Sequence, residues 1–332
     1  MVVRAEYLCA KIKQLVNEQV VPGVSFAFIT PECTIQDYYG ANSWQPSVTP
    51  LKADQLYDLA SLTKVLGTTT LLLHLIEQGQ LQWKSKVADF LPYFQDSRVT
   101  ITHLMTHTSG IRGYIPHRDQ LSAPQLLRAL QQLPVTDEFE QVVRYTDTGP
   151  ILAGLIIEQL YQKPVQTVIA QQILQPLKLP MATFKPDPDL CVVTNRRAGY
   201  WLKGQVHDPK AWQLGPHCGS SGLFASVADL LVFTQWFLGQ TKTIHPPIQQ
   251  TMIDYLFQDF TKKQLGRSFG WDLRLNCVRQ AVLYHTGFTG NFWLIDKQRQ
   301  RALIVLSNRV HPLVQNQRFF LERDAIVDLF LQ

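Results

Sequence analysis

The chain has 332 residues, and its 45% hydrophobic content is enough to bury a sizeable core in one large domain or two ordinary ones. Lysine and arginine number 31 against 26 acidic residues, but they are scattered and run together only in pairs such as Arg196–Arg197, so we expect no nucleic-acid partner. The five cysteines are odd in number, widely spaced and without a CxxC pair, which argues against both a disulfide framework and a zinc site.

The amino-terminal segment, residues 4–20, has apolar residues at helical intervals and predicts an amphipathic helix, after which GVSFAFIT and TIQDYYG predict two strands. The helix lacks the continuous apolar core and the small-residue cleavage site of a signal peptide. We therefore expect a cytoplasmic protein. The stretch from Val65 to Ile76 is too short to cross a bilayer, so no membrane span is expected.

From Ser61 to Gly239 the pattern is mainly helical, with predicted segments at 61–79, 100–106, 122–133, 148–162, 164–174 and 226–238. After Gly266 it returns to strands, SFGWDLRL, QAVLYHTG, GNFWLIDK and RALIVLSN, followed by a closing helix, RFFLERDAIVDLFL. The predicted fold is an α/β (α+β) arrangement: one antiparallel sheet built from both chain ends and flanked by helices, with a helical domain inserted. We predict a sheet domain of residues 1–60 and 240–332, a helical domain of residues 61–239, and an active site between them.

A serine and a lysine stand one helical turn apart at the head of the apolar run DLASLTKVLGTTTLLL. If Ser61 begins a helix, its side chain and that of Lys64 share a face at i, i+3. A lysine can activate a hydroxyl when its surroundings favour the neutral amine or when a neighbour shares the proton. The helix amino terminus also offers a backbone N–H to an oxyanion. In isolation, however, such a motif much more often has its serine as an N-cap and its lysine as a solvated residue of the first turn.

Two further motifs follow in order: RYTDTG, with Tyr145 and Asp147 before an apolar helix, and His285-Thr286-Gly287 between two strands. The set SxxK, YxD and HxG resembles the three active-site motifs of the penicillin-recognising serine hydrolases, the class C β-lactamases, DD-peptidases and β-lactamase-like esterases. ITHLMTHTSGI and CGSSGLFASVADLLVF also resemble segments of that family. The resemblance covers roughly residues 23–310 and implies a β-lactamase/transpeptidase-like fold.

The resemblance also implies roles for individual residues. Ser61 would be the acylated nucleophile and Lys64 its proton acceptor, while Tyr145 would share that proton. The backbone N–H groups of Ser61 and Phe288 would form the oxyanion hole, and Gly287 would let substrate approach the backbone closely. Asp147, His285, Thr286 and Gly287 would line the substrate groove. No cofactor and no metal are implied.

Three positions depart from the family pattern. His285 replaces a common lysine, so the hold on a substrate carboxylate should weaken. Asp147 replaces a common asparagine; it can only accept hydrogen bonds when ionised, and it favours protonated Lys64. Phe288 places an aromatic ring where β-lactamases often have a small residue. These departures favour an esterase-like or peptidase-like hydrolase over an efficient β-lactamase.

Two functions stay open on the sequence. The first is a serine hydrolase that forms an acyl-enzyme with an ester, an amide or a D-amino-acid peptide, its partner being a small molecule or short peptide. The second is a non-catalytic relative that keeps the fold as a binding or sensing module. HLMTH, from His103 to His107, has the i, i+4 spacing of a zinc helix but lacks the glutamate of HExxH, so we expect no metal there. The sequence does not indicate the oligomeric state.

Overall fold

The structure is a computed structural model that describes residues 2–179, 181–241 and 246–332. Its centre is a seven-stranded antiparallel sheet in the order β3-β2-β1-β11-β10-β9-β8. The strands of this sheet are β1 (Gly23–Ile29), β2 (Thr34–Ser43), β3 (Thr49–Pro50), β8 (Asp272–Leu275), β9 (Ala281–Gly287), β10 (Asn291–Asp296) and β11 (Arg301–Ser307). Two small ribbons are β4 (Tyr57–Asp58) with β7 (Phe224–Ala225), and β5 (Val193–Arg197) with β6 (Tyr200–Lys203).

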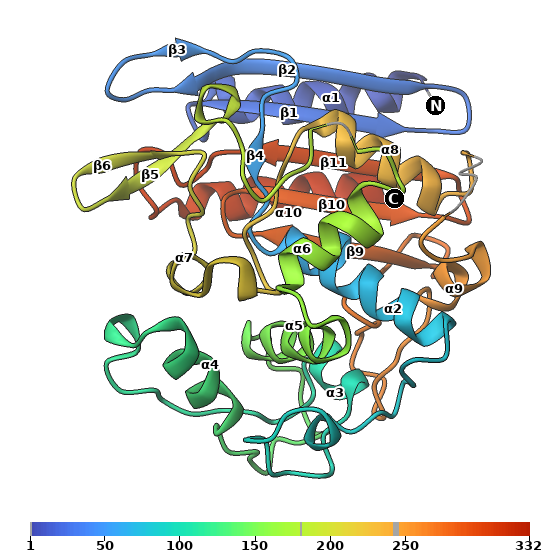
Figure 1. Cartoon of the computed structure of the whole chain (residues 1–332). Helices are drawn as coiled ribbons and strands as arrows, with labels where there is room; N and C mark the ends of the chain where they lie inside the picture. Colours follow the sequence, from blue (N-terminus) through green and yellow to red (C-terminus); the bar gives the residue numbers. More distant parts are fainter. Residues whose placement is uncertain (1, 180, 242–245) are drawn as a thin grey trace.

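The helices cover the sheet and build the half of the molecule below it in Figure 1. They are α1 (Val2–Asn17), α2 (Thr70–Glu77), α3 (Ile101–Met105), α4 (Ala123–Gln131), α5 (Thr148–Tyr161), α6 (Val165–Ile169), α7 (Pro209–Leu214), α8 (Val227–Phe237), α9 (Gln250–Tyr255) and α10 (Gln317–Leu331). Two π-helical segments, η1 (Lys64–Thr69) and η4 (Ala170–Leu174), lead into α2 and continue α6. Short 3-10 turns are η2 (Val87–Asp89), η3 (Arg118–Gln120), η5 (Pro188–Leu190) and η6 (Gly215–His217).

Alternation along the central strands divides the core into two layers. On β1, Phe26 and Phe28 pack with residues of α1 and α10, while Ala27 and Ile29 face the larger core shared with the helical half. Successive side chains of a strand point to opposite faces, so a strand buried on both sides reads as a continuous apolar run. This explains why GVSFAFI is buried at every position.

The predicted sheet from both chain ends is confirmed, because β1 pairs with β2 on one side and with β11 on the other. The division into a sheet domain and a helical domain stays a prediction. Within the segment assigned to the helical domain, α8 packs against the sheet, and Trp293 Nε1 on β10 donates to Thr234 Oγ1 on α8 at 3.0 Å.

Several elements differ from the sequence-based expectation. The strand predicted to begin at Ser268 begins only at Asp272, and the sequence did not indicate α7, α9 or the β5–β6 hairpin. The hairpin depends on a contact distant in sequence, the hydrogen bond of 3.0 Å from Asn308 Nδ2 to the Val193 carbonyl. Within the described residues, no helix has the length and apolar character needed to span a membrane.

Candidate active site

The candidate nucleophile stands at a sharp turn between strand β4 and a buried helix. Ala60, just before Ser61, has a left-handed backbone with φ of +46°, and the helical turn starts immediately after Ser61. A left-handed conformation is uncommon for a residue other than glycine, and such strained positions cluster at functional sites. The turn presents Ser61 to a cavity while Leu62 and Lys64 enter the core.

The buried side chain of Asp58 stabilises this turn through hydrogen bonds. One carboxylate oxygen accepts from the Ala60 N–H at 2.9 Å, and the other accepts from the His207 N–H at 2.7 Å. The Asp58 carbonyl accepts from Thr289 Oγ1 and from Asn291 Nδ2, both in the segment from the end of β9 to β10. Burial raises the pKa of Asp58 to about 6, against the lowering effect of the two backbone N–H groups. One buried carboxylate therefore joins the nucleophile's turn to the loops around it.

Lys64 lies beside the nucleophile and is almost fully buried, with 1% of its surface exposed. Its Nζ is 2.6 Å from Ser61 Oγ, 3.0 Å from the Ser220 carbonyl and 2.9 Å from Asp147 Oδ1. Three oxygen partners match the three donors of an ammonium group. Lys210, at the start of α7, pairs with the other carboxylate oxygen of Asp147.

The charges in this group determine its resting protonation. Burial alone would lower the pKa of Lys64, but the adjacent Tyr145 and Asp147 outweigh it and raise that pKa above its usual value. Burial would likewise raise the pKa of Asp147, but the Lys64 and Lys210 ammonium groups hold it well below its usual range. At neutral pH the group therefore holds a carboxylate between two cations, and Lys64 donates to Ser61.

Tyr145 faces the same cavity and stays 47% exposed. The centre of its ring lies 5.4 Å from Lys64 Nζ and 4.5 Å from the centre of the His107 ring. His107 also holds the backbone of the YxD motif, since its carbonyl accepts from the Arg144 N–H at 2.8 Å. The segment ITHLMTHTSGI thus positions the second motif.

The third motif approaches the nucleophile along the edge of β9. A Cβ built on Gly287 would stand 2.5 Å from the Leu59 carbonyl, which is closer than any side chain tolerates, so only glycine fits there. Phe288 follows directly and lines the cavity with Ser61. Within the described residues, no protein acceptor binds the backbone N–H of either Ser61 or Phe288. Both donors remain available to an oxyanion.

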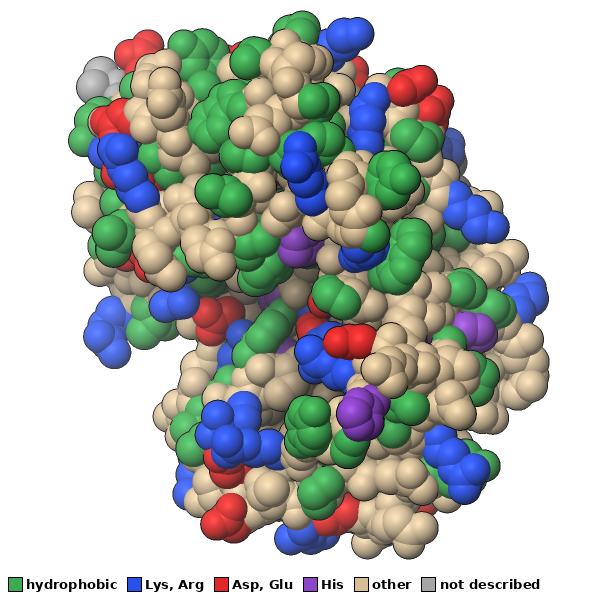
Figure 2. Space-filling view, turned by 90° about the vertical axis from the view of Figure 1, so that its left-hand side faces the viewer, with side chains coloured by type: hydrophobic (Ala, Val, Ile, Leu, Met, Phe, Trp, Pro, Cys, Tyr) green, Lys and Arg blue, Asp and Glu red, His purple; other side chains and the backbone are tan. Residues whose placement is uncertain are grey.

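These residues surround a cavity of about 470 Å³. Figure 2 shows the molecule hollowed between its upper and lower parts, with histidine and basic side chains gathered in the hollow. Of the site residues predicted from sequence, the lining includes Ser61, Tyr145, Asp147, Thr286, Gly287 and Phe288. Lys64 lies behind this surface, in contact with Ser61.

His285 does not take the place predicted for it. Its side chain is only 3% exposed and does not line the cavity, because alternation along β9 turns it into the core, 6.0 Å from the Tyr145 ring. Burial, followed by the charges of Arg267 and Lys64, lowers the pKa of His285 well below its usual value. The expectation that His285 touches substrate is therefore corrected: the imidazole is a neutral core group behind Tyr145.

The cavity has a basic end that the motifs did not reveal. Arg309 and Arg323 line it together with Phe320. Arg309 is 2% exposed, its guanidinium carbon lies 4.7 Å from the centres of the Phe288 and Phe320 rings, and its Nη1 donates to the Val314 carbonyl. Burial, then the charge of Arg323, lowers the pKa of Arg309 to about 10. Among the described residues, no carboxylate forms an ion pair with Arg309.

Sequence reasoning missed Arg309 because an arginine just after a strand is normally a solvated loop residue, and no spacing sets it apart. His207 and Asp208 were left without a role, and both line the cavity. The Asp208 carboxylate caps α7 through the Ala211 N–H at 2.8 Å, and the His207 ring stacks on Phe288 at 5.4 Å. An aspartate followed by proline is a helix-start signal that could have revealed α7 and, with it, Lys210.

No group of three His, Cys, Asp or Glu side chains in the described parts of the chain is arranged to hold a metal ion. The two histidines of HLMTH diverge. His103 Nδ1 and Nε2 contact Thr100 and Glu140, whereas His107 packs on Tyr145.

Comparison with known proteins agrees with this geometry. The sequence pattern of the family described as Beta-lactamase matches residues 8–325. The chain belongs to the beta-lactamase family. One curated relative of the chain is a putative D-alanyl-D-alanine carboxypeptidase of Escherichia coli K12. It is 26% identical over 320 residues, and the match covers 81% of this chain and 73% of the relative.

Two solved structures have the same fold. EstCE1, a hydrolase with promiscuous acyltransferase activity, aligns with a TM-score of 0.78 at 19% identity and covers 98% of both chains. The beta-lactamase/D-alanine carboxypeptidase from Pseudomonas syringae aligns with a TM-score of 0.76 at 18% identity and covers 99% of both chains. The resemblance and the fold class predicted from sequence are thereby confirmed, and family membership supports a hydrolase activity in general.

Proposed function

We propose that the protein is a serine hydrolase that forms an acyl-enzyme at Ser61 and acts on an ester, an amide or a D-amino-acid peptide. The observation that carries this proposal is the contact of 2.6 Å between Lys64 Nζ and Ser61 Oγ. Ser61 and Phe288 both line the cavity, and within the described residues neither backbone N–H has a protein acceptor. A nucleophile beside a base and an oxyanion site is the arrangement that acyl transfer requires.

The reaction follows from these positions. Ser61 Oγ attacks the substrate carbonyl, its proton passes to the Lys64–Tyr145 pair, and the oxyanion accepts from the N–H groups of Ser61 and Phe288. Because resting Lys64 is a cation that already donates to Ser61, the pair must first lose a proton. The pair then returns the serine proton to the leaving group, and water releases the acyl group by the same steps in reverse.

The cavity wall supports a narrower substrate class. Phe288 and Phe320 provide apolar contacts, and Arg309 and Arg323 provide the positive charge that His285 does not. A buried arginine without a carboxylate partner is suited to a bound anion. We therefore propose a substrate that carries an apolar group and a carboxylate near its scissile bond, processed by an esterase-like or peptidase-like reaction.

A fluorophosphonate probe tests the serine mechanism directly. We expect covalent labelling of the peptide that contains Ser61, detected by mass spectrometry, and its complete loss in Ser61→Ala. The matched control is Ser221→Ala, which removes a hydroxyl from the same cavity wall and should keep the label on Ser61. Full turnover in Ser61→Ala would contradict the proposal. If Ser61 is labelled, a panel of chromogenic esters, D-alanyl peptides and nitrocefin, assayed with the wild type and with Ser61→Ala, identifies the substrate class.

The second candidate is a non-catalytic binding or sensing protein. One observation favours it: the Asp147 carboxylate holds Lys64 as a cation, which cannot accept the serine proton. This candidate predicts no labelling of Ser61 at any pH, together with tight, reversible binding of an anionic ester or peptide. Labelling that appears as the pH rises would decide for the hydrolase.

A further inference from the structure

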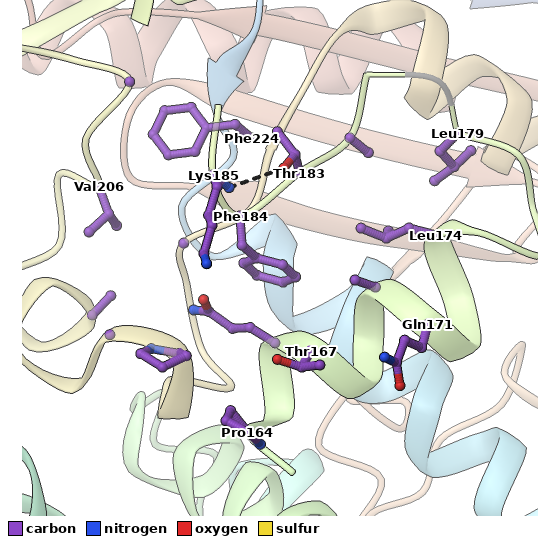
Figure 3. A pocket seen from close by; sticks show the side chains of 18 of the residues that line it. Pro164, Thr167, Gln171, Leu174, Leu179, Thr183, Phe184, Lys185, Val206 and Phe224 are labelled. Carbon is purple, nitrogen blue, oxygen red and sulfur yellow. Dashed lines mark hydrogen bonds between the residues drawn. The ribbon is translucent and has the colours of Figure 1, made fainter. Parts of the chain in front are cut away.

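A second, more voluminous cavity lies away from Ser61. It is a groove of about 1230 Å³ between α6 with η4 on one side and the segment leading from β6 into α7 on the other. Figure 3 shows Phe184 projecting into this space, with Lys185 beside it, Val206 across from it, and Thr167 and Gln171 on the helical side. No residue of the catalytic cavity lines the groove.

The groove and the catalytic cavity are adjacent, because residues that are neighbours in sequence line one space or the other. Val206 faces the groove and His207 faces the cavity, and Gly222 and Ser221 are divided in the same way. Gln166, which lines the groove, donates through Nε2 to the carbonyls of Cys218 and Ser221, both at 3.3 Å. The groove is therefore separate from the catalytic cavity, and the hydrogen bonds of Gln166 hold the segment between the two spaces.

The chemistry of the lining is apolar with positive charge. Apolar side chains form much of the surface, and they include Leu174, Leu179, Phe184, Val206, Trp212 and Phe224. The uncharged polar lining is mostly glutamine and threonine. The charged lining residues are Lys178 and Lys185, and neither forms an ion pair with a carboxylate in the described part of the chain. A surface with two unpaired cations and no acidic group favours an anion attached to an apolar body.

We propose that this groove binds an amphipathic monoanion of the fatty-acid type, with its hydrocarbon chain across Phe184 and its carboxylate at one of the two lining lysines, Lys185 or Lys178. A hydrocarbon chain suits an apolar space lined by aliphatic and aromatic side chains, and it needs no hydrogen-bond partners of its own. A strongly polar or cationic ligand would lack a counter-charge here. The proposal concerns binding only and does not depend on the reaction at Ser61.

Calorimetric titration with decanoate tests the proposal in the Ser61→Ala variant, in which turnover cannot interfere. We expect one molecule bound per chain. Hexanoate should bind on the order of 10²-fold more weakly, because it loses four methylene groups from an apolar site. Decan-1-ol, which keeps the chain and lacks the charge, should bind about tenfold more weakly.

Two sets of variants locate the site. The double variant Lys178→Gln, Lys185→Gln should weaken decanoate binding about tenfold. The control double variant Lys52→Gln, Lys84→Gln makes the same change in net charge at exposed positions outside the groove, and it should leave decanoate binding unchanged. Ala182→Trp should fill the groove and abolish binding, with circular dichroism confirming the fold. Loss of decanoate binding in Arg309→Gln but not in the groove variants would place the ligand in the catalytic cavity and overturn the proposal. Absence of binding, or equal affinity for decan-1-ol, would overturn it as well.

Discussion

Asp147 is the residue that most distinguishes this active site from the pattern it resembles. Its two carboxylate oxygens are shared between Lys64 and Lys210, so Asp147 helps to raise the pKa of the candidate base Lys64, and Lys210 on α7 helps to lower the pKa of Asp147. An asparagine in this place would leave both lysines without a counter-charge. The protonation of Lys64 is therefore set by a balance between one carboxylate and the second cation, Lys210.

That balance can be shifted in both directions. Activity should rise as the pH passes the pKa of the Lys64–Tyr145 pair, because only the deprotonated pair accepts the serine proton. Asp147→Asn removes the anion that raises the pKa of Lys64, and so should move this limb of the kcat/KM profile down by about one to three pH units. Lys210→Gln removes the opposing cation and should move it upward. Shifts in the same direction in both variants would contradict the shared-charge account.

Arg309 determines the substrate preference that we propose. Arg309→Gln should lower kcat/KM about 10- to 100-fold for an ester that carries a carboxylate, because a hydrogen bond to a charged group is lost. The neutral ester of the same shape should change by no more than about twofold. Arg309→Lys keeps the charge and should restore part of the loss. Thermal unfolding is the control: a buried cation without a carboxylate partner adds little stability, so the melting temperature should not fall. Equal losses for both esters would argue against carboxylate recognition.

At the scale of the element, strand β9 and the turn before Ser61 must approach each other more closely than any side chain allows. Gly287→Ala places a methyl group 2.5 Å from the Leu59 carbonyl, so β9 must move away from Ser61. We expect kcat to fall on the order of 10²-fold through the oxyanion hole while the fold persists. Gly113→Ala is the matched control, because its methyl group would meet side chains and no backbone: the end of the flexible Leu133 side chain at 2.9 Å and Pro134 Cδ at 3.3 Å. Unchanged kcat in Gly287→Ala would show that Phe288 N–H is not an oxyanion donor.

The sequence predicted the long elements and left out several of the short ones. The helix at 148–162 and the strands of β9, β10 and β11 were found because their apolar pattern continues over many residues. The six-residue helix α7 and the β5–β6 hairpin carry too few residues for a period to emerge. The three motifs led to the candidate nucleophile Ser61, the candidate base Lys64 and the strand β9, but β9 is buried on both faces, and the direction of His285 depended on which of the two cores each face meets. Arg309 enters the cavity through tertiary packing alone.

At the scale of the whole molecule, the site is assembled from both chain ends and from the helical segment between them. Ser61 follows β4, Tyr145 precedes α5, and Phe288 follows β9. Asp58 connects the Ser61 turn with the segment from β9 to β10 and with the His207 loop, since its carboxylate and carbonyl accept hydrogen bonds from all three. Ser61, the candidate nucleophile, is thus held in its turn only when the sheet and the helical half have both folded around Asp58.

Asp58 should therefore affect stability, and its effect should depend on pH. Burial raises the pKa of Asp58 to about 6, whereas an unfolded aspartate titrates near about 3.9. Between these pH values the folded chain keeps a proton on Asp58 that the unfolded chain has lost. Above about pH 6 the Asp58 carboxyl ionises in the folded chain, and this ionisation lowers the free energy of unfolding. The loss disappears as the pH falls towards about 4. Asp58→Asn cannot titrate. In urea unfolding, the stability of the wild type relative to Asp58→Asn should increase by about 2 kcal/mol from about pH 7.5 to about pH 4. Asp54→Asn, at an exposed position, should show no such change. A difference that stays constant with pH would mean that Asp58 does not titrate in this range and that its hydrogen bonds to Ala60 and His207 outweigh its burial.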